Sequence, residues 1–312
     1  SGLNKFHSSN SPTQLGLDLL KNWRMVMAES ATQYGEVIFK DVITLIRLKD
    51  THTVILKNCS MTVEKGKLTV LVGPSGCGKT TVINLIAGYE VPYRGEVLME
   101  GKPITGPNWE RLVVFQEMAL FPWLTCYENV VFSPTVRGSM TKEEMHSEAL
   151  RLLELVGLKD FCEKYPMQLS GGMQRRAELA RALINQPKIM LMDEPFRGLD
   201  AMTRELMQEY YLKLFEATKS TNLFVTSEIE EAIFLADKLM VMTNKPTKIK
   251  KVIDVDLPRP RDWKMATSAR YRELKAETLE LLHEEAVKAS AASGKADLDL
   301  SAGYQKLKET QK

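Results

Sequence analysis

The sequence predicts an α/β fold with a mixed sheet at its core, a helical subdomain within that core, and helical extensions at both ends. Three observations predict it. A glycine-rich loop at residues 73–80 lies between an apolar run and a helix-like run. A second apolar run, at residues 189–192, ends in two carboxylates. Around both, short apolar segments alternate with amphipathic stretches, which is typical of strand–helix units packed about one sheet.

The composition fits such a fold and limits the classes of binding partner that we expect. The 312 residues exceed one average domain, and a core with extensions accounts for them. A formal charge of +2 gives no support for nucleic acid as a partner. Four cysteines without paired or metal-like spacing predict reduced thiols. Because no apolar run approaches the roughly 18 residues of a membrane span and no secretory signal precedes the fold, we expect any membrane role to come through a partner.

We expect three regions along the chain. Residues 1–35 form an extension in which residues 13–31 carry apolar side chains at helical spacing. The apolar face of this helix is expected to pack on the core, on a partner helix or on a membrane surface. Residues 36–250 form the core domain. Residues 251–312 form a second extension, with prolines at 257–262, an amphipathic helix at 269–289 and a polar tail after a small-residue link.

Within the core domain, strands are expected at residues 54–63, 95–99, 223–225 and 239–242. Residues of about 117–175 are expected to be helical. There Thr141 and Glu144 have the spacing of a capping box, and the helix that follows places Leu150, Leu153 and Val156 on one face.

The glycine-rich loop fits the pattern G-x-x-x-x-G-K-[ST], with a strand before it and a helix after it. Its backbone N–H groups and the start of the helix form a cradle for phosphates. Lys79 is expected to reach the β- and γ-phosphates, and the Thr80 hydroxyl to ligate Mg²⁺. The residues expected to contact the nucleotide here are Gly73, Pro74, Ser75, Gly76, Cys77, Gly78, Lys79, Thr80 and Thr81.

The two carboxylates after the second apolar run are Asp193 and Glu194. Open α/β sheets place ligand chemistry at the carboxyl ends of their strands. We therefore expect Asp193 to hold Mg²⁺, directly or through water, and Glu194 to polarise an attacking water. An ordinary core strand running into a solvated acidic turn is the alternative, and the phosphate loop upstream disfavours it.

A third feature is the turn Ser170-Gly171-Gly172 ahead of a helix-like stretch. It is either a second anion cradle or simply a capped helix start. The phosphate loop, LSGGMQ (169–174) and MDEP (192–195), in this order, resemble the ATP-binding subunit of an ABC transporter. The resemblance covers about residues 36–260 and implies a P-loop NTPase fold of the ABC ATPase type that binds and hydrolyses ATP with Mg²⁺.

The resemblance also implies a second ATPase subunit, identical or different, arranged head to tail. Residues Ser170, Gly171, Gly172, Met173 and Gln174 would then close over the ATP held by the partner's phosphate loop. Met173 stands where the family usually has Gln, and the two glycines carry the cradle.

Four further positions take roles from the resemblance. Gln116 would sense Mg²⁺ and couple to a membrane partner, and Asp200 would communicate across the dimer. Phe121 and Trp123 lie where such subunits receive the permease, so they form either a docking groove or a cap on the core of the helical subdomain.

Two departures from the family pattern bear on catalysis. Ser227 stands where the family has a histidine that contacts the γ-phosphate. Since the loss of one preorganised contact costs about two to three orders of magnitude in rate, slow hydrolysis is expected. The segment that usually supplies an aromatic side chain to stack on adenine has none, which leaves Arg47 or His52 as candidates or a solvated hairpin charge as the alternative.

Residues 114–125, 198–204, 232–237 and 257–262 look like the nitrate/sulfonate/taurine class of importer ATPases. This implies a permease dimer, a periplasmic binding protein, a small oxyanion or sulfonate as cargo chosen by those subunits, and a peripheral place at the cytoplasmic face of the inner membrane. Two alternatives remain open. One is a regulatory nucleotide-binding module with little hydrolysis, and the other is a soluble ABC ATPase without a permease.

Overall fold

The computed structural model describes residues 34–48, 51–218 and 220–292. The helix expected at 13–31 and the tail after 292 lie outside these residues. The described chain divides into two compact units. One contains Glu117–Lys188 and Pro195–Ser220; the other contains Gly35–Gln116, Ile189–Glu194 and the described residues from Thr221 onwards.

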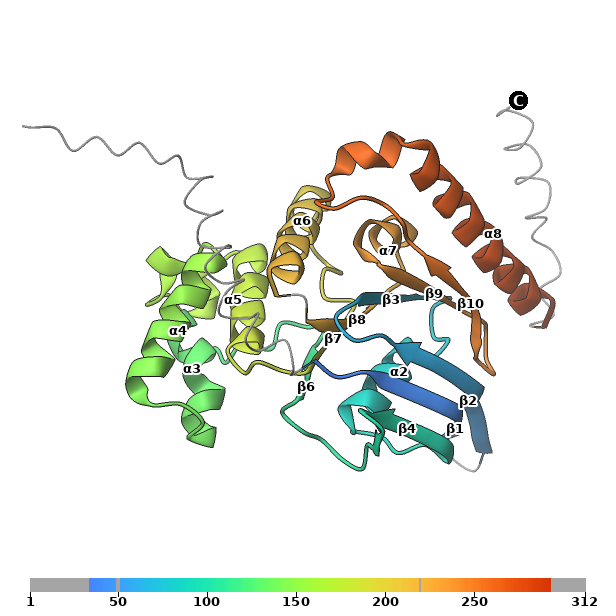
Figure 1. Ribbon diagram of the computed structural model, residues 1–312, viewed down its shortest axis with the longest axis horizontal. Helices are drawn as coiled ribbons and strands as arrows, with labels where there is room; N and C mark the ends of the chain where they lie inside the picture. Colours follow the sequence, from blue (N-terminus) through green and yellow to red (C-terminus); the bar gives the residue numbers. More distant parts are fainter. Residues whose placement is uncertain (1–33, 49–50, 219, 293–312) are drawn as a thin grey trace, which may run out of the picture. The chain divides into compact units, whose positions relative to one another are not determined.

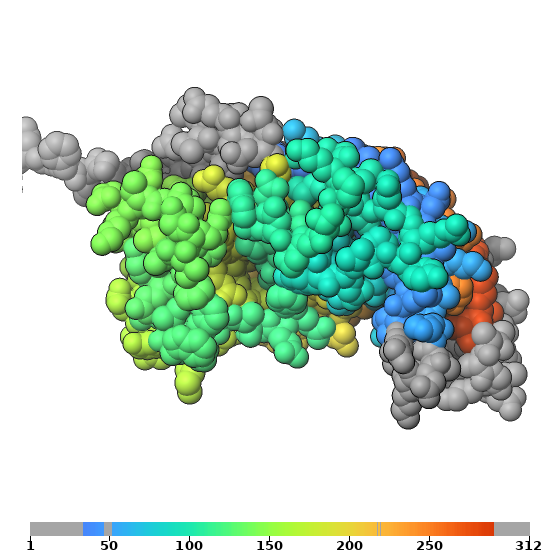
Figure 2. All heavy atoms as spheres, turned by 90° about the horizontal axis from the view of Figure 1, so that it is seen from below, coloured from blue at the N-terminus to red at the C-terminus, as the bar shows by residue number. Residues whose placement is uncertain are grey.

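The second of these units, which we call the nucleotide unit, contains two sheets. An antiparallel sheet has the order β2-β1-β4-β5, with β1 (Val37–Leu48), β2 (Thr51–Val63), β4 (Arg94–Met99) and β5 (Lys102–Pro103). The expected strands at 54–63 and 95–99 lie within β2 and β4. In Figure 2 the blue and teal atoms of β1, β2, β4 and the segments between them gather on one face of this unit.

The other sheet has six strands in the order β10-β9-β3-β8-β7-β6. They are β3 (Leu68–Val72), β6 (Arg111–Val114), β7 (Ile189–Asp193), β8 (Thr221–Thr226), β9 (Lys238–Met242) and β10 (Ile249–Asp254). The five strands β9, β3, β8, β7 and β6 are parallel, and β10 is antiparallel. Every residue of β3 and β8 is buried, as expected of parallel strands covered on both faces.

Helices cover both faces of this six-stranded sheet (Figure 1). One face packs with α2 (Lys79–Ala87) and the antiparallel sheet around a shared apolar core. The other face packs with α7 (Ile229–Leu235), and α8 (Ala269–Ala292) follows the short helix η3 (Trp263–Thr267) and packs on α7 and β9. The amphipathic helix expected at 269–289 is therefore α8. Strand β10 continues the sheet past position 250, where the core domain was expected to end.

The other unit, which we call the helical unit, contains α3 (Cys126–Arg137), α4 (Lys142–Leu155), α5 (Gly171–Leu183) and α6 (Ala201–Thr218), with the short helices η1 (Lys159–Phe161) and η2 (Pro166–Gln168). Capping boxes begin α3 at Thr125 and α4 at Thr141. Leu153 and Val156 are buried in the apolar core that α3, α4 and α5 share, as the spacing predicts, whereas Leu150 is half-buried and is not among the residues of that core. No helix of the described residues is long and apolar enough to cross a membrane.

A buried ion pair lies within α5, and its carboxylate also binds the loop before α3. Arg175 and Glu178 are 1% and 3% exposed at their side chains, and their Nη1 and Oε2 atoms are 2.6 Å apart. Glu178 also accepts a hydrogen bond from the backbone N–H of Ala119. Burial raises the pKa of Glu178 and lowers that of Arg175, while each charge opposes the shift of the other.

We expect Glu178→Ala to lower the free energy of unfolding by about 3–5 kcal/mol, because it removes the carboxylate that faces the buried Arg175 charge. Urea unfolding measures the change. The matched control is Glu148→Ala, which removes an i,i+3 pair with Arg151 that is about a quarter exposed on α4. For such a pair we expect a change below about 1 kcal/mol. Equal changes in the two variants would contradict the importance of the buried pair.

Candidate functional site: a phosphate loop beside a carboxylate edge

The parallel strands of the nucleotide unit end at one edge of the sheet. The phosphate loop follows β3, Glu194 follows β7, Ser227 follows β8 and Gln116 lies two residues after β6. Because β3, β8, β7 and β6 are consecutive neighbours, residues far apart in the sequence meet at this edge. The edge is where open α/β sheets bind ligands.

The phosphate loop has the backbone conformation that its glycines predict. Gly78 has φ 110°, and a Cβ there would lie 2.7 Å from Ile55 Cγ2. A side chain at this position therefore meets both backbone strain and a steric clash. The Cys77 side chain points into the core and is 2% exposed, whereas Ser75 and Gly76 are exposed at the surface of the loop.

Lys79, the first residue of α2, is 5% exposed. Its ammonium donates hydrogen bonds to the carbonyl oxygens of Gly73 at 3.0 Å and Pro74 at 3.2 Å. It also lies 3.8 Å from Oε1 of Glu194. The ammonium thus lies across the loop, next to the carboxylate that the sequence nominates as the base.

Glu194 is held in an uncommon backbone conformation. Its φ is 43°, in the left-handed region, and its N–H donates to the carbonyl of Val225 at 2.9 Å. Such strain in a residue other than glycine is frequent at functional sites. The Ser227 hydroxyl donates to Oε1 of Glu194 at 2.6 Å, a short charge-assisted hydrogen bond. Ser227 therefore holds the carboxylate of Glu194.

The sequence did not predict this contact. It identified Ser227 only as a replacement for histidine, 33 residues from Glu194. No local pattern predicts that a serine after β8 bonds to a glutamate after β7, because the contact depends on which strands are neighbours.

Asp193 ends β7 and is hydrogen-bonded to the side chain of Thr80. Burial raises the pKa of Asp193, and the neighbouring charge of Glu194 adds to this, while the Thr80 hydrogen bond and Lys79 oppose it. The hydroxyl and the carboxylate expected to bind Mg²⁺ are therefore adjacent. Gln116 is exposed just beyond β6.

The turn at Ser170 lies in the helical unit. The Ser170 hydroxyl caps α5 by accepting a hydrogen bond from the N–H of Met173 at 3.3 Å. The turn is therefore a capped helix start, and its expected role as an anion cradle stays a prediction. The Gln174 amide donates to the carbonyls of Pro166 and Leu169 and braces the turn. Met173 packs partly on the apolar core of this unit.

Gly171 begins α5, and a Cβ added to Gly172 would lie 3.0 Å from the Thr203 side chain. Asp200 lies before α6 and accepts from the N–H of Thr203 at 3.0 Å. The hydrogen bonds from Thr203 lower the pKa of Asp200. The exposed Asp200 therefore has a structural role as a helix cap, and its expected role across a dimer stays a prediction.

The loop at 121–124 forms an exposed aromatic surface on the helical unit. Trp123 is 70% exposed, and its ring centroid lies 5.5 Å from that of Phe121. Phe121 also packs on Phe132, 41% exposed, at 4.6 Å. The fully buried Asn129 holds this loop through hydrogen bonds with both the N–H and the carbonyl of Phe121. Trp123 therefore does not cap the core.

The adenine-stacking candidates remain predictions. Strand pairing places Arg47 opposite His52 on β1 and β2. His52 is exposed, and the side chain of Arg47 lies outside the described part of the chain.

Comparison with known proteins places this geometry in a family. A family model described as "ABC transporter" matches residues 56–197. An uncharacterised ABC transporter ATP-binding protein of Methanocaldococcus jannaschii is 43% identical over 233 residues, which cover 75% of this chain and 86% of that protein. The chain belongs to the ABC transporter family of ATP-binding proteins and is an ABC-type ATPase.

Other relatives carry more specific names. The aliphatic sulfonates import ATP-binding protein SsuB of Bacillus cereus is 40% identical over 74% of this chain and 90% of its own length. The taurine import ATP-binding protein TauB of Roseobacter denitrificans is 46% identical over 64% of this chain and 74% of its own length. The predicted resemblance to this class of importer ATPases is confirmed at the level of sequence.

Among solved structures, a dimeric ATP-binding cassette in a post-hydrolysis state bound to ADP and Pi matches with a TM-score of 0.61 and 29% identity. The match covers 71% of this chain and 100% of that chain. The structure of cbiO1 from Clostridium perfringens, part of the ABC transporter complex cbiONQ, has a TM-score of 0.65 at 21% identity and supports the fold alone. The predicted α/β ABC ATPase fold is thereby confirmed.

Proposed function

We propose that this chain is the ATP-hydrolysing subunit that powers an importer of small sulfonates or related oxyanions. One observation carries the hydrolytic part: Lys79 and Ser227 converge on the carboxylate of Glu194, at 3.8 and 2.6 Å. The importer part is supported by the likeness to the sulfonate and taurine import proteins. The cargo itself is selected by other subunits.

In this proposal Glu194 takes a proton from the water that attacks the γ-phosphate. The hydrogen bond from Ser227 occupies one carboxylate oxygen, which orients the other toward the water. Lys79 moves from the loop carbonyls to the β- and γ-phosphates when ATP binds, so that it no longer pairs with Glu194, which then acts as the base.

The residues at this edge fit Mg²⁺. Thr80 and Asp193 offer adjacent hard oxygen donors, and Gln116 supplies an amide oxygen nearby along the sheet edge. Within the described ranges, no group of three or more His, Cys, Asp or Glu is placed to hold a metal. Mg²⁺ at nucleotide sites characteristically takes one or two carboxylates and completes its shell with phosphates and water. When bound, it would neutralise charge on the β- and γ-phosphates.

The partners proposed are a second ATPase subunit, identical or different, and a membrane-embedded permease that holds this chain at the cytoplasmic face. The Ser170–Gln174 turn of one subunit would meet ATP on the phosphate loop of the other. The aromatic surface of Phe121, Trp123 and Phe132 is proposed as the permease contact, since exposed aromatic side chains held by a rigid loop are typical of binding hot spots.

The test is co-purification of the chain with membrane proteins of its source cells, extracted in detergent, and a permease is the expected partner. We expect Trp123→Ala to weaken the association by about 2 kcal/mol, the usual loss for a central aromatic anchor. Trp109→Ala, an exposed tryptophan of the nucleotide unit, is the matched control. Equal retention of the permease by both variants would remove Trp123 from the interface. The absence of any membrane protein bound to the unaltered chain would remove the importer proposal itself.

A further inference from the structure

A cavity of about 660 Å³ lies beside the phosphate loop, within the nucleotide unit. Three segments line it. They are the loop residues 75–77, the turn of residues 243–248 between β9 and β10, and the last turns of α8. The turn is at the same edge of the sheet as the phosphate loop, because β9 is the parallel neighbour of β3.

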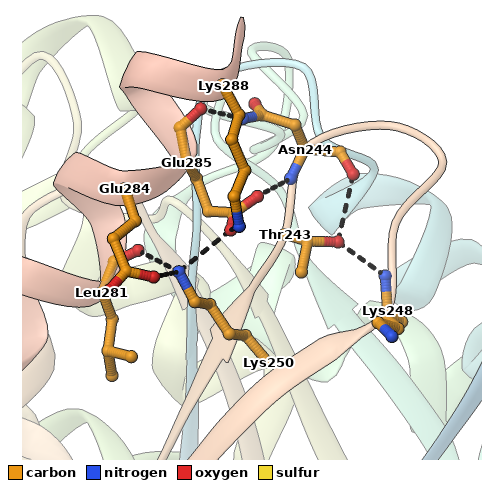
Figure 3. A network of polar contacts seen from close by, with 8 residues as sticks. All are labelled: Thr243, Asn244, Lys248, Lys250, Leu281, Glu284, Glu285 and Lys288. Atoms are coloured by element: carbon orange, nitrogen blue, oxygen red, sulfur yellow. Dashed lines mark hydrogen bonds and ion pairs between the residues drawn. The ribbon is translucent and has the colours of Figure 1, made fainter.

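The three walls are linked by hydrogen bonds. The Thr247 hydroxyl donates to the carbonyl of Cys77 in the phosphate loop at 2.5 Å. The N–H of Asn244 donates to Oε2 of Glu285 on α8 at 3.0 Å, and Figure 3 shows Asn244 and Glu285 facing each other across this contact. These hydrogen bonds hold the three walls of the cavity in fixed positions relative to one another.

The cavity is lined by more positive than negative charge. Lys245, Lys248 and Lys288 contribute ammonium groups, and Glu285 is the carboxylate among the lining residues. Glu285 is already satisfied: its side chain is 4% exposed and accepts from Lys250 at 2.9 Å and from Lys288 at 3.0 Å. Although burial opposes it, these hydrogen bonds and that of Asn244 lower the pKa of Glu285 to about 2.

Lys288 is paired with Glu285, whereas Lys245 and Lys248 are not paired with it. Both are exposed, and neither ammonium has an ion-pair partner among the described residues. Both lysines line the same cavity as residues 75–77 of the phosphate loop. The cavity therefore holds two lysines whose charge is not balanced by the protein.

We propose that this cavity is a second anion site, which binds a small oxyanion of about two negative charges through the ammonium groups of Lys245 and Lys248. The shared chemistry is a phosphate-like group, either free phosphate or sulfate or the terminal phosphates of a second nucleotide. The site is independent of the proposed importer role, because it depends only on residues of the nucleotide unit.

The test is calorimetric titration of inorganic phosphate into the full chain saturated with ADP, so that the phosphate loop is occupied. The double variant Lys245→Gln/Lys248→Gln is expected to bind phosphate about tenfold more weakly, since each partly exposed contact contributes up to about 1 kcal/mol. Lys65→Gln, another exposed lysine of this unit, is the matched control and is expected to leave the affinity unchanged. Both substituted lysines are exposed, so folding is expected to persist, and circular dichroism checks it.

A second titration, with ATP in place of phosphate, distinguishes the sources. A second equivalent of ATP per chain that the double variant loses would support the site and identify a nucleotide as its occupant. Phosphate binding without such an equivalent would support a free oxyanion. If phosphate binds to the double variant with the same affinity as to the unaltered chain, it binds elsewhere, for example beside ADP. That result would overturn the proposal. Failure of the ADP-saturated chain to bind phosphate overturns it as well.

Discussion

Replacing Ser227 by histidine is expected to raise the steady-state rate of ATP hydrolysis by about two orders of magnitude. Ser227 is exposed at the end of β8, and its hydroxyl is committed to Glu194 at 2.6 Å. A serine hydroxyl is too short to contact the γ-phosphate except through water. An imidazole at this position extends further and supplies a donor that is preorganised for the charge that develops on the phosphate. Steady-state phosphate release at saturating ATP and Mg²⁺ measures the change.

Ser227→Ala is the companion variant. It removes the hydrogen bond to Glu194 without adding a donor, so we expect a loss of about tenfold, equivalent to one hydrogen bond to a charged group. An unchanged rate in Ser227→His would mean that the step limiting turnover makes no use of a contact from this position.

Lys79→Ala is expected to weaken ATP binding by about a hundredfold, since a hydrogen bond between charged groups contributes about 1.5–3 kcal/mol. Lys79 is 5% exposed and lies across the loop, where its ammonium bonds to Gly73 and Pro74. Fluorescence titration with a labelled ATP analogue measures the affinity. Lys65→Ala is the control, because Lys65 is an exposed lysine in a turn of the same unit.

The affinity of Lys79→Ala for ATP tests whether the loop after β3 is the phosphate site. If this variant binds ATP as tightly as the Lys65→Ala control, then the loop after β3 is not the phosphate site. A stability measurement separates binding from folding, because saturating ATP stabilises only the chains that bind it.

Much of this site was predictable from short segments of sequence. The glycines of residues 73–80 dictate a loop conformation that few other residues adopt, and the buried strand before Asp193 is a continuous apolar run. The capping box at Thr141 and Glu144 is likewise a local pattern, and the helix begins there. Features set by residues close in the chain were therefore predicted correctly.

What the sequence could not predict depends on strand order and on packing. The bond between Ser227 and Glu194 exists because β8 lies beside β7. The ion pair of Arg175 and Glu178 looks like an ordinary i,i+3 surface pair in the sequence, yet tertiary packing buries both side chains. The cavity beside the phosphate loop exists because α8 packs against the turn after β9. The residues that meet there are about 40 positions apart along the chain.

The most direct test of the account is the steady-state rate of ATP hydrolysis by the purified chain, measured with Glu194→Gln as the blank. We expect turnover above the blank in the presence of Mg²⁺, and a loss of about two to four orders of magnitude when the general base is removed. Tight ATP binding should remain in the variant, since Lys79 and the loop are intact. Equal rates for the unaltered chain and the variant would contradict the assignment of Glu194 as the base and of this chain as the hydrolytic subunit.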